Sequence, residues 1–135
     1  MPLDKDTELC VTARGLSLNA AAADITRGLR LPREPMEERD LLALSVRLRV
    51  LLGILEHTAK AELMKMKRDG RSGWVTPYLH LLAAHEVLDT DSTGATGRVP
   101  LDASSHALST ATAASQLWAF LARERAGSTQ GGVGA

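Results

Sequence analysis

The segment EVLDTDSTGATG, residues 86–97, is the part of the chain whose residue types and spacing come closest to a site for chemistry. Asp89, Asp91 and Thr93 have the spacing of the first, third and fifth positions of a calcium-binding loop, whose side chains supply oxygen ligands. Gly94 stands where such a loop has its turn glycine. The twelfth position of such a loop needs a bidentate Glu, and Pro100 stands there instead. The pattern therefore lacks the ligand that closes a calcium site.

The letters DTDST, residues 89–93, also match the Asp-x-Asp-x-Thr pattern of phosphoryl-transfer enzymes, in which an aspartate attacks phosphorus and Mg²⁺ bridges the reacting groups. That arrangement follows a buried strand and needs a later Lys and a later acidic pair. The rest of the chain supplies neither. We therefore interpret the segment as a polar, turn-rich link between two helices.

The other residues with chemical potential form no catalytic pattern. His80 and His85 are five residues apart, about 140° around a helix, whereas a metal-binding pair on one face is three or four residues apart. Cys10 is expected to be a small buried residue rather than a reactive thiol. The sequence has no nucleophile elbow, P-loop or dinucleotide-binding glycine pattern. We predict no catalytic residue, no metal and no cofactor.

Two groups of residues remain as candidates for binding. A basic run at the end of a predicted helix could contact phosphates or a protein partner: Lys60, Lys65, Lys67, Arg68 and Arg71. A pocket between helices could be lined by aromatic and imidazole side chains: Trp74, Tyr78, His85 and Trp118. The alternative for the basic run is a solvated helix end whose charges complement the helix dipole, and we favour that alternative.

Composition favours an all-α fold. Hydrophobic residues make up 44% of the 135 residues and aromatic residues only 3%, so the core must be aliphatic and rich in alanine. The formal net charge is zero, which gives no global preference for nucleic acid or an anionic membrane. A single Cys fits a reducing cytoplasm, and no apolar run is long enough for a membrane span. We expect a cytoplasmic protein with no membrane partner.

Apolar periodicity predicts a small bundle of four to five helices with one long central helix. The long helix is expected over 34–69, with Pro35 at its first position, and its main stripe recurs every three to four residues: Leu41, Leu44, Leu48, Leu52, Leu55, Ala59, Leu63 and Met66. Val46, Val50 and Ile54 should widen the buried face. In a helix over 77–88, five side chains are predicted to share one face: Tyr78, Leu81, Leu82, His85 and Leu88.

Two short helices are predicted in the first forty residues, the second one capped by Asn19, and a last helix is predicted after Asp102. Residues 1–126 are expected to form a single helical domain. Residues 127–135 are expected to be a disordered glycine-rich tail.

Three stretches between Leu41 and Leu121 resemble a family of short actinobacterial helical proteins labelled natural-product biosynthesis protein, of unknown function. They are LSVRLRVLLGILEHTAKAE, AAHEVLD and SSHALSTATAASQLWAFL. The resemblance implies a cytoplasmic helical accessory protein and brings no site residues with it.

The sequence therefore favours a non-catalytic helical accessory protein that acts by self-association or by binding another protein. A helix of about 33 residues, roughly 50 Å long, exceeds what a domain of this size needs, so we expect it to protrude or pair. A DNA-binding regulator that uses the basic run is the first alternative. A helical bundle that binds a small molecule is the second.

Overall fold

The computed structural model describes residues 17–93 and 103–134, and this part of the chain is all-α, with four helices and no strand. The helices are α2 (Leu18–Leu29), α3 (Glu38–Arg68), α4 (Val75–Thr93) and α5 (Ala103–Gly134). The predicted first short helix, Cys10 and the proposed cap Asp102 lie outside the described residues.

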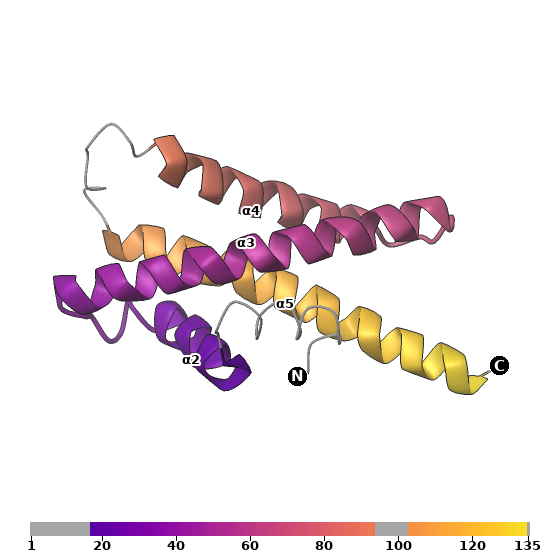
Figure 1. Cartoon of the computed structure of the whole chain (residues 1–135), viewed down its shortest axis with the longest axis horizontal. Coiled ribbons are helices and arrows are strands. Elements are labelled where there is room, and N and C mark those ends of the chain that lie inside the picture. The colour runs from indigo at the N-terminus through magenta and orange to yellow at the C-terminus, as the bar shows by residue number, and fades with distance from the viewer. Residues whose placement is uncertain (1–16, 94–102, 135) are drawn as a thin grey trace.

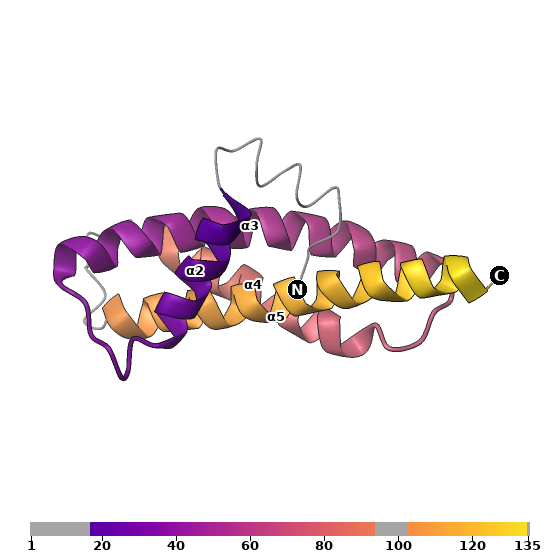
Figure 2. The ribbon, with the colours of Figure 1, turned by 90° about the horizontal axis from the view of Figure 1, so that it is seen from below.

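The three long helices lie alongside one another, and α2 crosses α3 and α5 as a shorter fourth element (Figures 1 and 2). α3 and α5 run in the same direction. α4, which lies between them in the sequence, runs in the opposite direction. Both α3 and α5 pack against every other described helix, whereas α2 and α4 do not pack against each other. The predicted long central helix is therefore confirmed, and α5 shares its central position.

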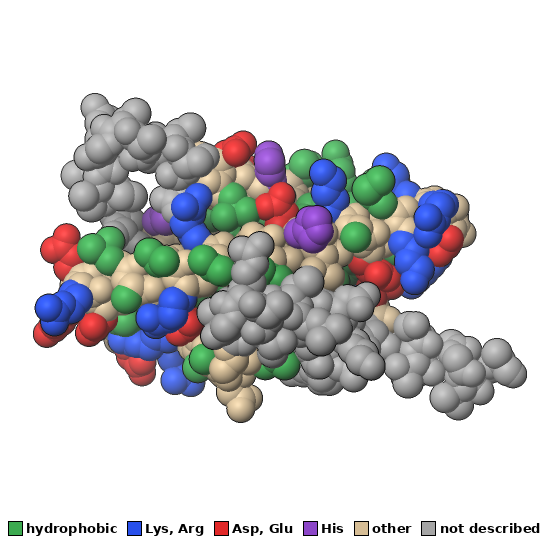
Figure 3. Space-filling view, viewed as in Figure 1, with side chains coloured by type: hydrophobic (Ala, Val, Ile, Leu, Met, Phe, Trp, Pro, Cys, Tyr) green, Lys and Arg blue, Asp and Glu red, His purple; other side chains and the backbone are tan. Residues whose placement is uncertain are grey.

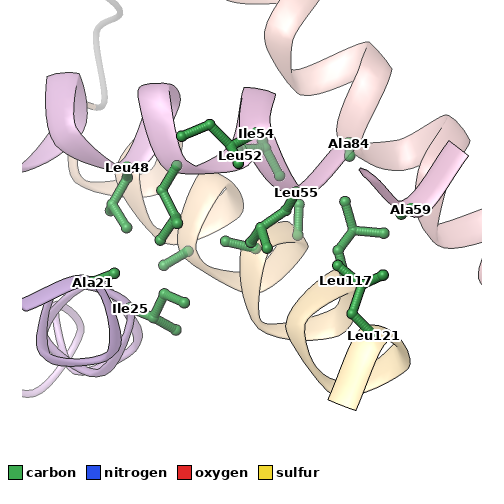
Figure 4. Packing of buried hydrophobic residues seen from close by; sticks show 14 of the residues in the cluster. Ala21, Ile25, Leu48, Leu52, Ile54, Leu55, Ala59, Ala84, Leu117 and Leu121 are labelled. Carbon is green, nitrogen blue, oxygen red and sulfur yellow. The ribbon is translucent and has the colours of Figure 1, made fainter. Parts of the chain in front are cut away.

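The core is aliphatic, as composition predicted. All eight residues of the main α3 stripe are buried, so the apolar period identified this face correctly. Figure 4 shows how side chains from all four helices meet in one interior: Ala21 and Ile25 of α2, Leu48, Leu52 and Leu55 of α3, Ala84 of α4, and Leu117 and Leu121 of α5. Alanines on α2, α4 and α5 allow the backbones to come close, so few aromatic residues are needed to fill the space.

The start of α2 differs from the prediction. Its cap is Ser17, whose Oγ accepts a hydrogen bond from the Ala20 N–H at 3.4 Å, and Asn19 lies within the helix. Serine and asparagine are both good N-caps, so the sequence alone did not decide between them. The cap fixes where α2 enters the bundle.

The start of α3 also differs. The helix begins at Glu38, after Glu37 in an extended conformation, so Pro35 lies before the helix rather than at its first position. Backbone hydrogen bonds from Arg33 and Glu34 to the Arg30 carbonyl form a turn there, which holds the chain in a non-helical path. Acidic Glu38 and Asp40 in the first turn and three basic residues in the last turn follow the helix dipole, as predicted.

The end of α3 is a Schellman motif. Gly70 has φ of 69°, its N–H donates to the Lys67 carbonyl, and the Arg71 N–H donates to the Met66 carbonyl at 3.0 Å. Glycine adopts this left-handed conformation without the steric cost that a Cβ brings. The sharp stop turns the chain back toward α4.

We expect Gly70→Ala to lower the free energy of unfolding by about 1–2 kcal/mol because alanine is strained at positive φ. In the part of the chain that the structure describes, no atom lies within 4 Å of the added methyl group, so we attribute the loss to backbone strain. Urea denaturation followed by circular dichroism measures the change. Gly70→Asn is the control, since asparagine tolerates this conformation, and it should lose less. Equal stability of Gly70→Ala and the unmodified protein would contradict the prediction.

α4 and α5 are both longer than predicted. Residues 89–93, interpreted as part of a polar link, are the last turns of α4, and residues 94–102 lie outside the described part. α5 continues to Gly134, through most of the stretch expected to be a disordered tail. Glycine has a low helix propensity, so the composition of that stretch does not explain why the helix continues through it.

Exposed ion pairs connect the helices at two places. Arg47 of α3 donates two hydrogen bonds to the Asp24 carboxylate of α2, at 2.9 and 3.1 Å, and this raises the pKa of the Arg47 guanidinium above its ordinary value. Arg71 donates to Glu124 of α5 at 2.8 Å. Both pairs are widely separated in sequence, so they fix how neighbouring helices align.

Candidate interaction surface

The most prominent feature of the surface is an apolar row on the outer side of α3, opposite the buried stripe. We call it the α3 outer row. It consists of the exposed large apolar residues of that helix: Leu42, Val46, Val50 and Met64. Val46 and Met64 are each 63% exposed. The expectation that Val46 and Val50 widen the buried face is therefore wrong for both, whereas Ile54 is buried, as expected.

The physical reason is the position of these residues around the helix. α2, α4 and α5 all pack against α3, and the row lies on a side that stays exposed among the described residues. Leu51, which did not belong to the predicted stripe, is almost fully buried instead. The four-residue spacing of Leu42, Val46 and Val50 was a signal of a second face, but spacing alone does not say which face a neighbour covers.

A second group of exposed apolar residues lies on α4. We call it the α4 outer patch, and its members are Val75, Tyr78, Leu79 and Leu82. The five residues predicted to share a face of α4 differ in exposure, because Tyr78, Leu82 and His85 are exposed while Leu81 and Leu88 are half-buried. Ala84 of α4 is fully buried in the core. Because its side chain is small, α4 can pack closely against the core with this side facing inward. Figure 3 shows hydrophobic side chains along this face of α3 and α4.

A polar cluster connects α3 with α4 beside these apolar groups. His85 Nδ1 lies 3.3 Å from Oε1 of Glu56 on α3, and His85 Nε2 lies 3.4 Å from Oδ2 of Asp89 on α4. A protonated imidazole would donate to both carboxylates, whereas a neutral one donates to only one. Within the described ranges, no group of three or more His, Cys, Asp or Glu side chains is arranged to hold a metal ion.

The predicted basic run is exposed but does not form a single stripe. Consecutive residues of a helix are about 100° apart, so Lys60 and Lys67 lie on one side of α3 and Lys65 on nearly the opposite side. Three members have partners within the protein: Arg71 pairs with Glu124, the Lys67 ammonium lies 4.9 Å from the centre of the Trp74 ring, and Arg68 pairs with Asp69. Arg68 lies 3.9 Å from Asp69.

The residues of the predicted pocket do not line one cavity. Trp74 and Tyr78 contact each other edge to face at the start of α4, with 5.9 Å between ring centres. His85 lies two turns further along α4 and is exposed. Trp118 lines a separate open groove of about 220 Å³ between α2 and α5, together with Ile25, Thr26 and Ser115. This volume is below the roughly 300–1,000 Å³ of typical small-molecule sites.

The remaining candidates for chemistry are distributed over the fold. His57 lies on α3, His80 on α4 and His106 on α5, and Cys10 lies outside the described part. Asp89 belongs to the last turns of α4, so the calcium-loop and phosphoryl-transfer interpretations do not match its helical conformation. The surface groups that stand out are thus apolar ones, which the search for chemical motifs did not single out.

Comparison of the chain with known protein families, curated proteins and solved structures gives no match. No helix within the described ranges combines the length and the apolar character needed to cross a membrane.

Proposed function

We propose that this chain is a non-catalytic helical accessory protein that acts by associating with another protein chain, either a second copy or a different partner. The contact surface would be the α3 outer row and the α4 outer patch. The observation that carries this proposal is the number and grouping of large apolar side chains that two neighbouring helices leave exposed. We also propose a cytoplasmic location, in keeping with the single cysteine.

Apolar surface costs about 25 cal/mol for each Å² that stays in contact with water, and grouped apolar surface marks a place for interaction. The eight residues of the two groups are each 39–63% exposed. Among the side chains that the structure describes, Leu29 is the one other large apolar side chain that is exposed, and the rest are buried or half-buried. A partner that covers the two groups would recover this hydrophobic free energy.

The basic run and the predicted pocket residues give less support to the two alternative functions, nucleic-acid binding and small-molecule binding. Nucleic-acid binding would rely on basic residues that point to different sides of α3 and that are partly engaged by Glu124 and Trp74. Small-molecule binding would rely on a groove smaller than typical ligand sites.

We expect Val46→Glu combined with Leu79→Glu to abolish association while the fold is retained. Each change places a carboxylate in the centre of one apolar group, and a charge that is buried without a partner opposes contact. The measurement is solution mass by light scattering at low and high salt, together with capture of partners from the native lysate. Association driven by apolar contact should persist at high salt, because salt screens charges only.

The matched control is Ser109→Glu combined with Thr112→Glu, at exposed positions of α5 away from the two apolar groups. This variant should associate as the unmodified chain does, and circular dichroism should show the same helical content for all three proteins. A monodisperse monomer that captures no partner from its native lysate would refute the proposed function.

A further inference from the structure

The two ends of the α3 outer row, Leu42 and Met64, lie at equal distances along the helix from Gly53. Leu42, Gly53 and Met64 are eleven residues apart, which is close to three helical turns, so the three positions line up along one side of the helix. Successive positions between them follow a spacing of four, four and three residues: 42, 46, 50, 53, 57, 61 and 64. An eleven-residue period stays almost straight along a helix, so a second helix can follow the row over its length.

Gly53 at the centre of the row leaves room for close contact. No atom lies within 4 Å of the place where its Cβ would be, so this side of α3 is open in the described structure. Without a side chain at this position, two helices can approach closely where they cross. Among the described helices, α3 lies along one side of the bundle in Figure 2.

The charges at the two ends of α3 are complementary. Residues 37–41 hold three acidic side chains and one basic side chain, while residues 65–69 hold three basic ones and one acidic one. The two segments lie at equal distances from Gly53. Two α3 helices that pair in opposite directions about Gly53 therefore bring each acidic end beside a basic end, and their helix dipoles also oppose. Pairing in the same direction would put like ends together.

From these observations we infer that the partner is a second copy of this chain, whose α3 docks antiparallel on the α3 outer row with the twofold axis at Gly53. This inference rests on the proposed function and names the occupant of one of its two apolar groups. In a twofold interface each contact occurs twice. Leu42 meets Met64 of the second copy, and Val50 meets His57. Val46 meets the aliphatic stem of Lys60, whose ammonium reaches water.

One contact opposes this arrangement. Arg39 comes level with Arg68 of the second copy on the same side of the helix pair. Like charges at exposed positions cost only a few tenths of a kcal/mol. The acidic Glu38 and the basic Lys67 lie on the other side of the pair and attract each other. The apolar contacts and the overall charge balance therefore decide the direction of pairing.

The test is cross-linking of single cysteines in the full chain with Cys10→Ser as the background. A short bismaleimide links thiols only where the dimer brings them close. We expect a mixture of Leu42→Cys and Met64→Cys chains to give at least about fivefold more covalent dimer than either chain alone. Gly53→Cys should cross-link to itself, because its position lies on the axis. Ser109→Cys, exposed on α5, is the control and should not cross-link.

The outcomes separate the inference from the proposed function. Efficient self-linking of Leu42→Cys would mean a parallel pair and would overturn the inference, while self-association would stand. A dimer in light scattering that cross-links at none of these positions would also overturn it and would place the contact elsewhere. A monomer that captures a different protein would overturn the inference and leave the proposed function intact. A monomer without any partner would overturn both.

Discussion

Replacing Leu55 by alanine is expected to lower the free energy of unfolding by about 2–5 kcal/mol, the largest effect of any single change considered for this protein. Leu55 is fully buried on α3, in the cluster to which α2, α4 and α5 all contribute. Removing its isobutyl group would lose the hydrophobic transfer energy and leave a cavity that four packed helices cannot easily close. A loss of this size is a large fraction of the stability of a small domain.

Chemical denaturation monitored by circular dichroism, at a concentration low enough for the chain to be monomeric, measures the loss. Leu79→Ala is the matched control, because it removes the same atoms from a side chain that is 56% exposed. Its effect should stay within about 0.5 kcal/mol. Similar losses for the two variants would show that Leu55 is not in a well-packed interior.

The second large effect is expected from Gly28→Ala in α2, which should lower the free energy of unfolding by about 1–3 kcal/mol. A Cβ at Gly28 would lie 2.6 Å from the Ala111 Cβ of α5 and 3.2 Å from Cδ1 of Leu48 on α3. The first distance is far below van der Waals contact, so α2 would have to move away from α5. This clash outweighs the gain of about 0.5–1 kcal/mol that alanine normally brings within a helix.

Gly53→Ala makes the same chemical change where no atom of the described residues lies within 4 Å of the new methyl group. It should raise the free energy of unfolding of the monomer by up to about 1 kcal/mol, because alanine favours the helix and restricts the unfolded chain. The opposite sign of the two effects tests the packing directly. Ala111→Gly added to Gly28→Ala should recover part of the lost stability, and no recovery would contradict the proposed contact.

The buried face of α3 was predictable because its signal is strong and local. Apolar residues every three to four residues over eight positions, six of them leucines, define one side of a long helix, and all eight are buried. The acidic start and basic end of α3 were equally clear, since they complement the helix dipole. These features depend on the helix itself and need no knowledge of its neighbours.

The orientation of α4 was not predictable in the same way. Both sides of this helix carry leucines, with Leu79 and Leu82 on one side and Leu81 and Leu88 on the other. Periodicity grouped Leu82 with Leu81 and Leu88, and it could not show where the covered side of the helix ends. The position of Ala84 determines which side of α4 faces the core, because this small, fully buried side chain lets the helix pack closely there.

The candidate interaction surface was predictable only in outline. The length of α3 indicated that the helix would protrude or pair, but the residues chosen for binding were the basic run and the aromatic group. The α3 outer row was overlooked because Val46 and Val50 were expected to be buried. A valine at regular spacing fits either a core or an interface, since both are apolar.

By itself, the sequence determined an all-α chain, the long α3 helix, its buried leucine face and the distribution of charge along it. Helical period and dipole are properties of a single segment, so local residue order is sufficient for them. Only the tertiary structure decided which apolar faces are covered, where Trp118 lies, and that His85 lies between Glu56 and Asp89. Those features depend on how residues distant in sequence pack together, and the exposed face is simply the one that no other helix of the described structure covers.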